Sequence, residues 1–227
     1  MTTSPNTYRI VAVNAGVGQP SSTRLLVDRV AAALASLAEG ARVEVDVLEL
    51  RDLAADVASA SVSGLLSERL SDAVTNLTAA DGVVLATPIY KASYSGLFKS
   101  FVDVLPNDAL LGTPVLLLAT GGSPRHALAV DTTLRPLAAY LRALVAPTAL
   151  YASPEDWGTA GSRALAARVE RAAGELLTLV HGGAGRAMVA ADWGSYQRTL
   201  RLDPEADDEI TLDPDLLRAA TGGSLLG

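Results

Sequence analysis

The sequence predicts an α/β protein, a three-layer α/β/α sandwich built around a five-stranded parallel sheet. Two observations carry this prediction. Short apolar runs that are typical of buried strands alternate with amphipathic segments of helical period along residues 8 to 180. Three of these apolar runs also end in loops rich in glycine, hydroxyl or tyrosine side chains, as strands of open parallel sheets do where they bind ligands.

The expected elements follow one another as strand and helix along the chain. Strands are expected at residues 8–13, 42–50, 83–86, 114–119 and 148–151. Helices are expected after the first strand up to Gly40, then at residues 65–77, 95–105, 126–144 and 161–180. Residues 42–50 alternate apolar and acidic side chains, which is typical of an edge strand. This element order predicts the strand order 2-1-3-4-5, in which the carboxyl ends of strands one, three and four meet.

Two prolines are expected to interrupt regular structure. Pro88 has no N–H to give to a ladder, so the third strand is predicted to stop at Thr87 and Pro88. Pro136 lies inside the expected helix over residues 126–144, where its missing N–H frees the carbonyl of Thr132. We therefore predict a widened or kinked turn near Thr132.

Composition favours an enzyme that acts on small molecules. The formal net charge of −7 argues against broad nucleic-acid binding. No run reaches the ~18 consecutive apolar residues of a membrane span, and the N-terminus has no secretory signal, so we expect a cytoplasmic protein. Without cysteine, and with His126 and His181 as the only histidines, no thiolate catalysis or metal site is expected. No side chain is predicted to be catalytic.

The loop after the first strand predicts a phosphate-binding site. Gly16 and Gly18 let the backbone approach an anion. Ser21, Ser22 and Thr23 place hydroxyl groups at the start of the next helix, where backbone N–H groups and the helix dipole favour negative charge. Alternatively, a serine here only caps the helix, although three consecutive hydroxyls exceed what one cap needs.

Two further loops are expected at the same edge of the sheet. Residues 88–94 hold two tyrosines, a lysine and no acid, which suits a ligand site or a simple closure of the core. Gly121 and Gly122 follow the fourth strand, and adjacent glycines suit a backbone lying flat against a ring or phosphate, or a tight turn. The coincidence of the three loops carries the prediction of one ligand site.

Three motifs resemble the NAD(P)H-dependent FMN reductases of the flavodoxin-like fold. They are Pro-Ser-Ser-Thr-Arg at 20–24, Ala-Thr-Pro-Ile-Tyr-Lys-Ala-Ser-Tyr-Ser-Gly-Leu-Phe-Lys at 86–99, and Ala-Thr-Gly-Gly-Ser-Pro-Arg-His-Ala-Leu-Ala-Val-Asp with Leu-Arg-Pro-Leu at 119–137. The likeness is greatest to the branch that supplies reduced flavin to two-component, luciferase-like monooxygenases. It covers residues 8 to 180.

The resemblance implies which residues bind FMN. The phosphate is assigned to Ser21, Ser22 and Thr23, the ribityl chain and ring to Pro88, Ile89, Tyr90 and Lys91 with Tyr94 nearby, and the pyrimidine end of the ring to Gly121, Gly122, Ser123 and His126. This chain has Gly18 where many relatives have an arginine, which makes Arg24 the candidate cation for the phosphate.

The resemblance also implies an NAD(P)H-dependent FMN reductase that transfers hydride from NADPH or NADH to FMN and serves a luciferase-like monooxygenase. Backbone N–H groups near Gly121 and Gly122 would then stabilise negative charge developing on the reduced ring. Two alternatives stay open, namely a quinone, azo-dye or chromate reductase with bound FMN, and a flavodoxin-type electron carrier.

The expected organisation is one FMN-binding domain and an extension. The domain covers residues 1–182, and residues 183–227 form an extension that is partly disordered or packed on a neighbouring subunit. Apolar surface on residues 94–105 and 130–144 exceeds what one sheet face needs, so a homodimer or homotetramer is predicted.

Overall fold

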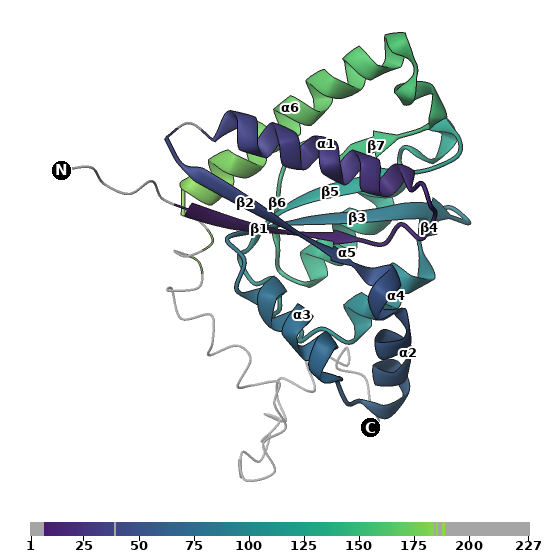
Figure 1. Ribbon diagram of the computed structural model, residues 1–227, viewed down its shortest axis with the longest axis vertical. Coiled ribbons are helices and arrows are strands. Elements are labelled where there is room, and N and C mark those ends of the chain that lie inside the picture. Colours follow the sequence, from purple (N-terminus) through teal and green to yellow (C-terminus); the bar gives the residue numbers. More distant parts are fainter. Residues whose placement is uncertain (1–6, 39, 184, 186–187, 189–227) are drawn as a thin grey trace, which may run out of the picture. The chain divides into compact units, whose positions relative to one another are not determined.

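The computed structural model describes residues 7–38, 40–183, 185 and 188 (Figure 1). The strands are β1 (Thr7–Asn14), β2 (Arg42–Glu49), β3 (Gly82–Tyr90), β4 (Ser93–Tyr94), β5 (Pro114–Thr120), β6 (Leu144–Val145) and β7 (Leu150–Ala152). The helices are α1 (Ser22–Leu37), α2 (Ala54–Ser63), α3 (Glu68–Thr78), α4 (Gly96–Asp103), α5 (Arg135–Tyr140) and α6 (Thr159–His181). Three short 3₁₀ turns, η1 (Leu50–Leu53), η2 (Pro124–His126) and η4 (Pro154–Trp157), and one π-helical turn, η3 (Val130–Leu134), join them.

The parallel strands lie in the order β2-β1-β3-β5, and both β6 and β7 pair with the far edge of β5. This confirms the predicted order 2-1-3-4-5, with the fifth position shared by two short strands. Residues 146–149 lie opposite residues 116–117 alone, so the chain bulges between β6 and β7. Pro147 lies in that bulge, where its lack of an N–H costs no ladder hydrogen bond.

The sheet is covered on both faces, which confirms the three-layer sandwich. In β1, Val11 and Val13 face a core shared with α2, α3 and α4, whereas Ile10 and Ala12 face a core shared with α1 and α6. Figure 1 shows α1 and α6 on one side of the sheet and α2, α3 and α4 on the other. Because β3 and β5 are buried on both faces, their sequences are continuous apolar runs, whereas β2 at the edge alternates apolar and charged side chains.

Strand β3 continues through Pro88 to Tyr90, so the prediction that it stops at Thr87 and Pro88 is wrong. The carbonyl of Ala86 faces β1, where it accepts from the N–H of Ala15 at 2.9 Å. The backbone of Pro88, two residues further along β3, also faces the side of β1. However, β1 ends at Asn14, which is the partner of Ala86, so no strand lies opposite Pro88 on that side. A proline there loses no ladder hydrogen bond, while Thr87 keeps its pairing with β5.

The helix expected at residues 65–77 is α3, which begins after Ser67 because the Ser67 side chain accepts from the Leu70 N–H at 3.2 Å. The preceding helix, α2, was not expected. It is ten residues long and buries only Val57 and Ala60, so its sequence has too few apolar side chains to show a helical period. It ends at Gly64, whose φ of 72° is favourable only for glycine.

The region around Pro136 confirms the predicted wide turn but not a continuous helix over residues 126–144. The N–H of Arg135 donates to the carbonyl of Val130, five residues back, in the π-turn η3. Pro136 then lies in the first turn of α5, where no N–H is needed. The helix ends at Tyr140, because Arg142 has a φ of 59° and the chain turns into β6.

The last expected strand and helix correspond to β7 and α6. The expected extension over residues 183–227 lies outside the described residues except for Gly183, Gly185 and Met188. Among the described residues, no helix combines the length and apolar composition that crossing a membrane requires.

Candidate active site

The carboxyl ends of β1, β3 and β5 lie side by side, so the three loops singled out from the sequence come together. Asn14 at the end of β1 pairs with Ala86, and Pro88 near the end of β3 pairs with Thr120. The hydroxyl groups of Thr23 and Thr120 are 2.7 Å apart and both buried, which joins the first loop directly to the third. The short β4 marks this edge in Figure 1.

The first loop curls back on itself at the start of α1. A Cβ on Gly16 would overlap with the Ser21 hydroxyl, so glycine is required there. Ser21 is the N-cap, and its Oγ accepts from the N–H of Arg24 at 3.2 Å. The N–H groups of Ser22 and Thr23 have no acceptor within the helix, and together they form a cradle for an anion.

The hydroxyl groups of Ser21, Ser22 and Thr23 have different partners and different exposure. Ser21 caps the helix, as the simpler interpretation held, while its own hydrogen remains able to donate. Thr23 is 1% exposed and is tied to Thr120. Ser22 is exposed and lies at the first position of the helix. A phosphate at this site would therefore meet Ser22 and Ser21 before it met Thr23.

A buried asparagine, which sequence reasoning missed, holds the base of the loop. Asn14 is 1% exposed, and its Oδ1 accepts from the Gly16 N–H at 3.1 Å. Its Nδ2 donates to Glu49 Oε2 at 2.8 Å, which links the loop to the end of β2. The sequence did contain a signal for this residue, because Asn14 directly follows an apolar strand. A polar side chain that is buried at the end of such a strand usually makes hydrogen bonds that hold the structure.

Arg24, the candidate cation from the sequence, is held by two carboxylates. Its Nε lies 2.8 Å from Asp28 Oδ1, and its Nη1 is paired with Glu49. Hydrogen bonds to Asp28 and then to Glu49 raise the pKa of Arg24 above its ordinary value. One positive charge thus faces two negative charges, which leaves little to attract a phosphate.

Residues 88–94 form a β-hairpin rather than the irregular loop expected. Ile89 pairs with Tyr94 and Tyr90 pairs with Ser93. The two residues of the turn, Lys91 and Ala92, have φ values of 51° and 67°, which is the type I′ geometry that glycine and asparagine prefer. Backbone strain in a non-glycine pair is typical of functional loops.

The predicted site residues of the hairpin differ in their exposure to solvent. Ile89 and Pro88 are buried, and Ile89 belongs to the core. Tyr90 is 52% exposed and Lys91 is exposed at the tip. Tyr94 is half-buried, with its ring 5.9 Å from that of Phe98. The side chains available to a ligand are therefore those of the tip and the outer strand.

Replacing Ala92 by glycine should stabilise the protein by about 1 kcal/mol, because a left-handed conformation costs an alanine roughly that much. Ala167→Gly is the matched control, since Ala167 is exposed within α6 and should cost about 0.5–1 kcal/mol there. Urea unfolding of both variants measures the difference. A lower midpoint for Ala92→Gly would contradict the turn geometry.

The third loop is fastened to β7 by Tyr151. The Tyr151 hydroxyl donates to the carbonyl of Ser123 at 2.6 Å, and burial raises the pKa of that hydroxyl, so it stays protonated. A Cβ on Gly121 would overlap with the same hydroxyl, and the Gly121 N–H donates to the carbonyl of Ala152 at 3.1 Å. The contact of Tyr151 with the third loop was not expected, because the residues around Tyr151 in the sequence indicate only a short strand.

The two glycines of this loop therefore have separate roles. The Gly121 N–H donates to the Ala152 carbonyl, so of the N–H groups expected near the ring this one already has an acceptor. Gly122 is exposed, and a Cβ there would meet no atom within 4 Å, so a flat ring can approach its backbone. His126 lies one turn further on, half-buried, with its N–H 3.3 Å from the Ser123 carbonyl.

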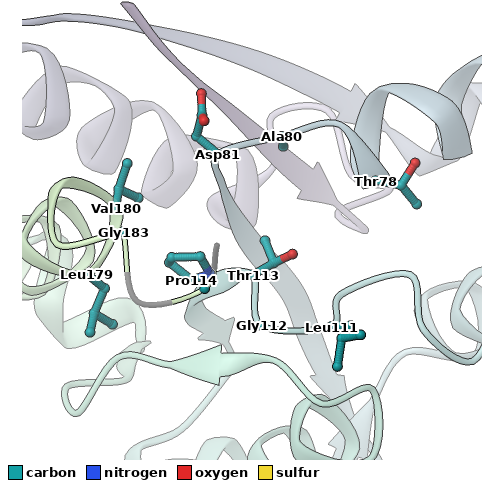
Figure 2. A pocket seen from close by; sticks show the side chains of 11 residues that line it. Thr78, Ala80, Asp81, Leu111, Gly112, Thr113, Pro114, Leu179, Val180 and Gly183 are labelled. Carbon is teal, nitrogen blue, oxygen red and sulfur yellow. The ribbon is translucent and has the colours of Figure 1, made fainter. Parts of the chain in front are cut away.

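A pocket of about 360 Å³ lies at the opposite end of the sheet (Figure 2). Figure 2 shows Leu179 and Val180 of α6 on one side of it and Thr78 of α3 on the other. It surrounds the starts of β3 and β5, and none of the predicted site residues lines it. Because open α/β sheets bind ligands at the carboxyl ends of their strands, we do not assign the active site to this pocket.

The comparisons with known proteins identify the family of this chain. The family model of NADPH-dependent FMN reductases matches residues 8–158. The NADH-dependent FMN reductase SfnE of Pseudomonas putida is 40% identical over 166 residues, which are 72% of this chain and 88% of that protein. An FMN reductase (NADPH) of Pseudomonas aeruginosa is 36% identical over 182 residues, 79% of this chain and 95% of that protein.

Solved structures show the same likeness. An oxidoreductase from Corynebacterium diphtheriae, 40% identical, superposes with a TM-score of 0.75 and covers 78% of this chain and 98% of its own. The apo form of the NADH:FMN oxidoreductase EMOB, 33% identical, superposes with a TM-score of 0.62 and covers 73% of this chain and 88% of its own. The chain therefore belongs to the NADPH-dependent FMN reductase family, and it is an oxidoreductase that acts with NAD(P)H and FMN.

Proposed function

We propose that this chain binds FMN at the three loops as an exchangeable flavin and supplies reduced FMN to a luciferase-like monooxygenase. The observation that best supports this site is the hydrogen bond between Thr23 and Thr120, which joins the start of α1 to the end of β5. The support for the monooxygenase is the resemblance of the three motifs to that branch of reductases. The cytoplasmic location stays a prediction.

The residues present fit FMN. The first turn of α1 offers the N–H groups of Ser22 and Thr23 to a phosphate, and Gly122 leaves open space for a flat ring. When bound, FMN accepts hydride from the nicotinamide C4 at its own N5, and this chemistry belongs to the flavin. The protein need supply no acid or base for that transfer, which agrees with the lack of a predicted catalytic side chain.

The chain's contribution is to bind and orient. We assign the phosphate to the first loop, and the ribityl chain and ring to the hairpin tip with Tyr90 and Lys91. Gly122 and Ser123 would face the pyrimidine end, and the N–H of Gly122 replaces that of Gly121 as the donor toward developing negative charge. Because Tyr90 is 52% exposed, the hairpin leaves the site open enough for flavin to exchange.

The delivery of reduced flavin is tested by coupling. A luciferase-like monooxygenase mixed with its substrate, NADH or NADPH and FMN should turn over only when this protein is added. The same protein should be assayed with quinone, azo-dye and chromate acceptors. A faster turnover with one of those acceptors than with free FMN would contradict the proposal and favour the first alternative.

Replacing Tyr151 by phenylalanine should weaken FMN binding about five-fold while leaving the fold intact. The ring still packs against Gly121, but the Ser123 carbonyl loses a donor, and such a loss costs about 1 kcal/mol. Quenching of flavin fluorescence measures the dissociation constant. Tyr8→Phe at the other end of β1 is the control, and equal losses in both variants would show that the hydrogen bond does not orient the loop.

We further propose a homodimer or homotetramer, as the apolar surface predicts. Leu128, just before η3, and Tyr140, the last residue of α5, are 72% and 70% exposed. Large apolar side chains exposed this far commonly mark contacts between subunits. Sedimentation velocity at micromolar concentration should show a dimer or tetramer, and Leu128→Ser with Tyr140→Ser should shift it toward monomer. A wild-type monomer would contradict the proposal.

A further inference from the structure

A phosphate bound at the first loop would meet no full positive charge from the loop itself. A phosphate monoester carries about two negative charges at pH 7, and backbone N–H groups alone carry only partial positive charge. Residues 14–23 include neither lysine nor arginine. Any full positive charge beside the cradle must therefore reach it from outside the loop.

Two guanidinium groups lie beside this loop, and their partners differ. Arg24 is bound to Asp28 and Glu49, so two negative charges offset its one positive charge. Glu49 is also fastened to Asn14, which keeps that carboxylate beside the loop. Moving Arg24 to a phosphate would leave Glu49 without its cation, which opposes the movement.

Arg51 is the other guanidinium group, and it contacts the loop through a neutral amide. With the amide of Gln19 turned so that its oxygen faces Arg51, that oxygen accepts from Nη1 at 2.7 Å and from Nη2 at 3.3 Å. The carboxylate of Asp52 lies 3.4 Å from Arg51 Nε and is more than half exposed. A neutral amide leaves the charge of Arg51 available, and a long, solvated ion pair offsets it only weakly.

The sheet explains why Arg51 arrives there. Strands β1 and β2 are parallel, and Glu49 at the end of β2 lies opposite Asn14 at the end of β1. Both strands therefore end at the same edge of the sheet. The chain continues from β1 into the phosphate loop and from β2 into η1. Arg51 is two residues past Glu49, close enough for its long side chain to reach Gln19.

We propose that Arg51 is the residue that supplies the positive charge for the phosphate of FMN, in place of the arginine missing at Gly18. This inference rests on the proposed function. Gln19 holds the guanidinium at the loop before flavin binds, and a guanidinium group can bind phosphate oxygens with two parallel N–H groups. Arg24 instead fixes the start of α1 to the end of β2.

The test compares FMN with riboflavin, which has the same ring and no phosphate. Arg51→Gln should weaken FMN binding at least ten-fold, as the loss of hydrogen bonds to a charged group by about 1.5–3 kcal/mol implies, and leave riboflavin binding unchanged. Added salt should weaken FMN binding to the wild type more than to Arg51→Gln. Flavin fluorescence quenching gives all these dissociation constants without measuring turnover.

The matched control is Arg42→Gln. Arg42 is the first residue of β2, whereas Arg51 lies two residues after the strand ends. Like Arg51, Arg42 pairs with a nearby carboxylate, which is that of Glu44. It removes the same charge at the far end of the strand, so FMN binding should not change. Arg51→Lys should recover part of the lost affinity, because a lysine keeps the charge without the planar fork.

Three results would overturn the inference. Equal weakening of FMN and riboflavin by Arg51→Gln would show a general distortion of the site. Selective weakening of FMN by Arg24→Gln but not by Arg51→Gln would assign the phosphate to Arg24. If the wild type bound FMN no better than riboflavin, the first loop would not bind the phosphate. That result would also contradict the proposed FMN site at the three loops.

Discussion

NADH or NADPH mixed with the protein alone should be oxidised only to the extent of any flavin that the protein already carries. Hydride needs an acceptor, and no side chain of the predicted site can take one, so in the absence of oxygen and of added flavin the reaction ends after at most one equivalent of any bound flavin. Added FMN should give sustained turnover, within the usual enzymatic range of about 1–1000 s⁻¹. Absorbance of the nicotinamide at fixed protein concentration, with and without FMN, measures this.

The control for this experiment is riboflavin at the same concentration. Riboflavin presents the same ring but no phosphate to the cradle at the start of α1, so it should be reduced with a higher KM. Failure to oxidise either nicotinamide even with abundant FMN would contradict the flavin reductase assignment and favour the electron-carrier alternative. Comparing NADH with NADPH in the same assay gives the coenzyme preference.

Removing two hydroxyls from the phosphate loop should weaken FMN binding at least ten-fold. The variant is Ser21→Ala combined with Thr23→Val, which keeps the shape of the buried threonine. Each hydrogen bond to a charged group contributes ~1.5–3 kcal/mol, and ~1.4 kcal/mol is a factor of ten. The rate at saturating FMN should change much less, because phosphate contacts are equally good before and during hydride transfer.

The control for the double variant is Thr120→Val. Thr120 lies at the end of β5 and its hydroxyl contacts only that of Thr23 among the described side chains, so this change breaks the junction without removing a phosphate donor. FMN binding should fall less than in the double variant. If the double variant binds FMN as tightly as the wild type, the phosphate does not bind at this loop.

Local rules suffice to predict several features of this fold. Pro136 removes one N–H and so predicts the wide turn at η3, a consequence that involves only residues within five positions. Alternating strands and helices predict the sheet order, because crossovers between parallel strands have one hand. The same sheet order predicts that the loops after residues 13, 86 and 119 converge.

Other features failed because they depend on neighbours in the sheet. Pro88 was expected to end β3, and it does not, because the adjacent strand β1 has already ended at Asn14. Helix α2 was missed because its ten residues bury only Val57 and Ala60, too few to show a period. For Pro88 the tertiary neighbour decided the outcome, whereas for α2 the local pattern was too weak to predict the helix.

The sequence by itself determined the fold, the edge of the sheet that holds the site, and the family, because these follow from period, element order and short motifs. Tertiary structure alone decided how the charged and polar groups are paired. Arg24 looked available from the sequence, yet Glu49 at the end of β2 binds it, while Arg51 contacts the loop through Gln19. Gly121 looked like a flavin contact, yet its lack of a side chain accommodates Tyr151. Such pairings join residues far apart in the chain, and only the folded backbone sets their distances.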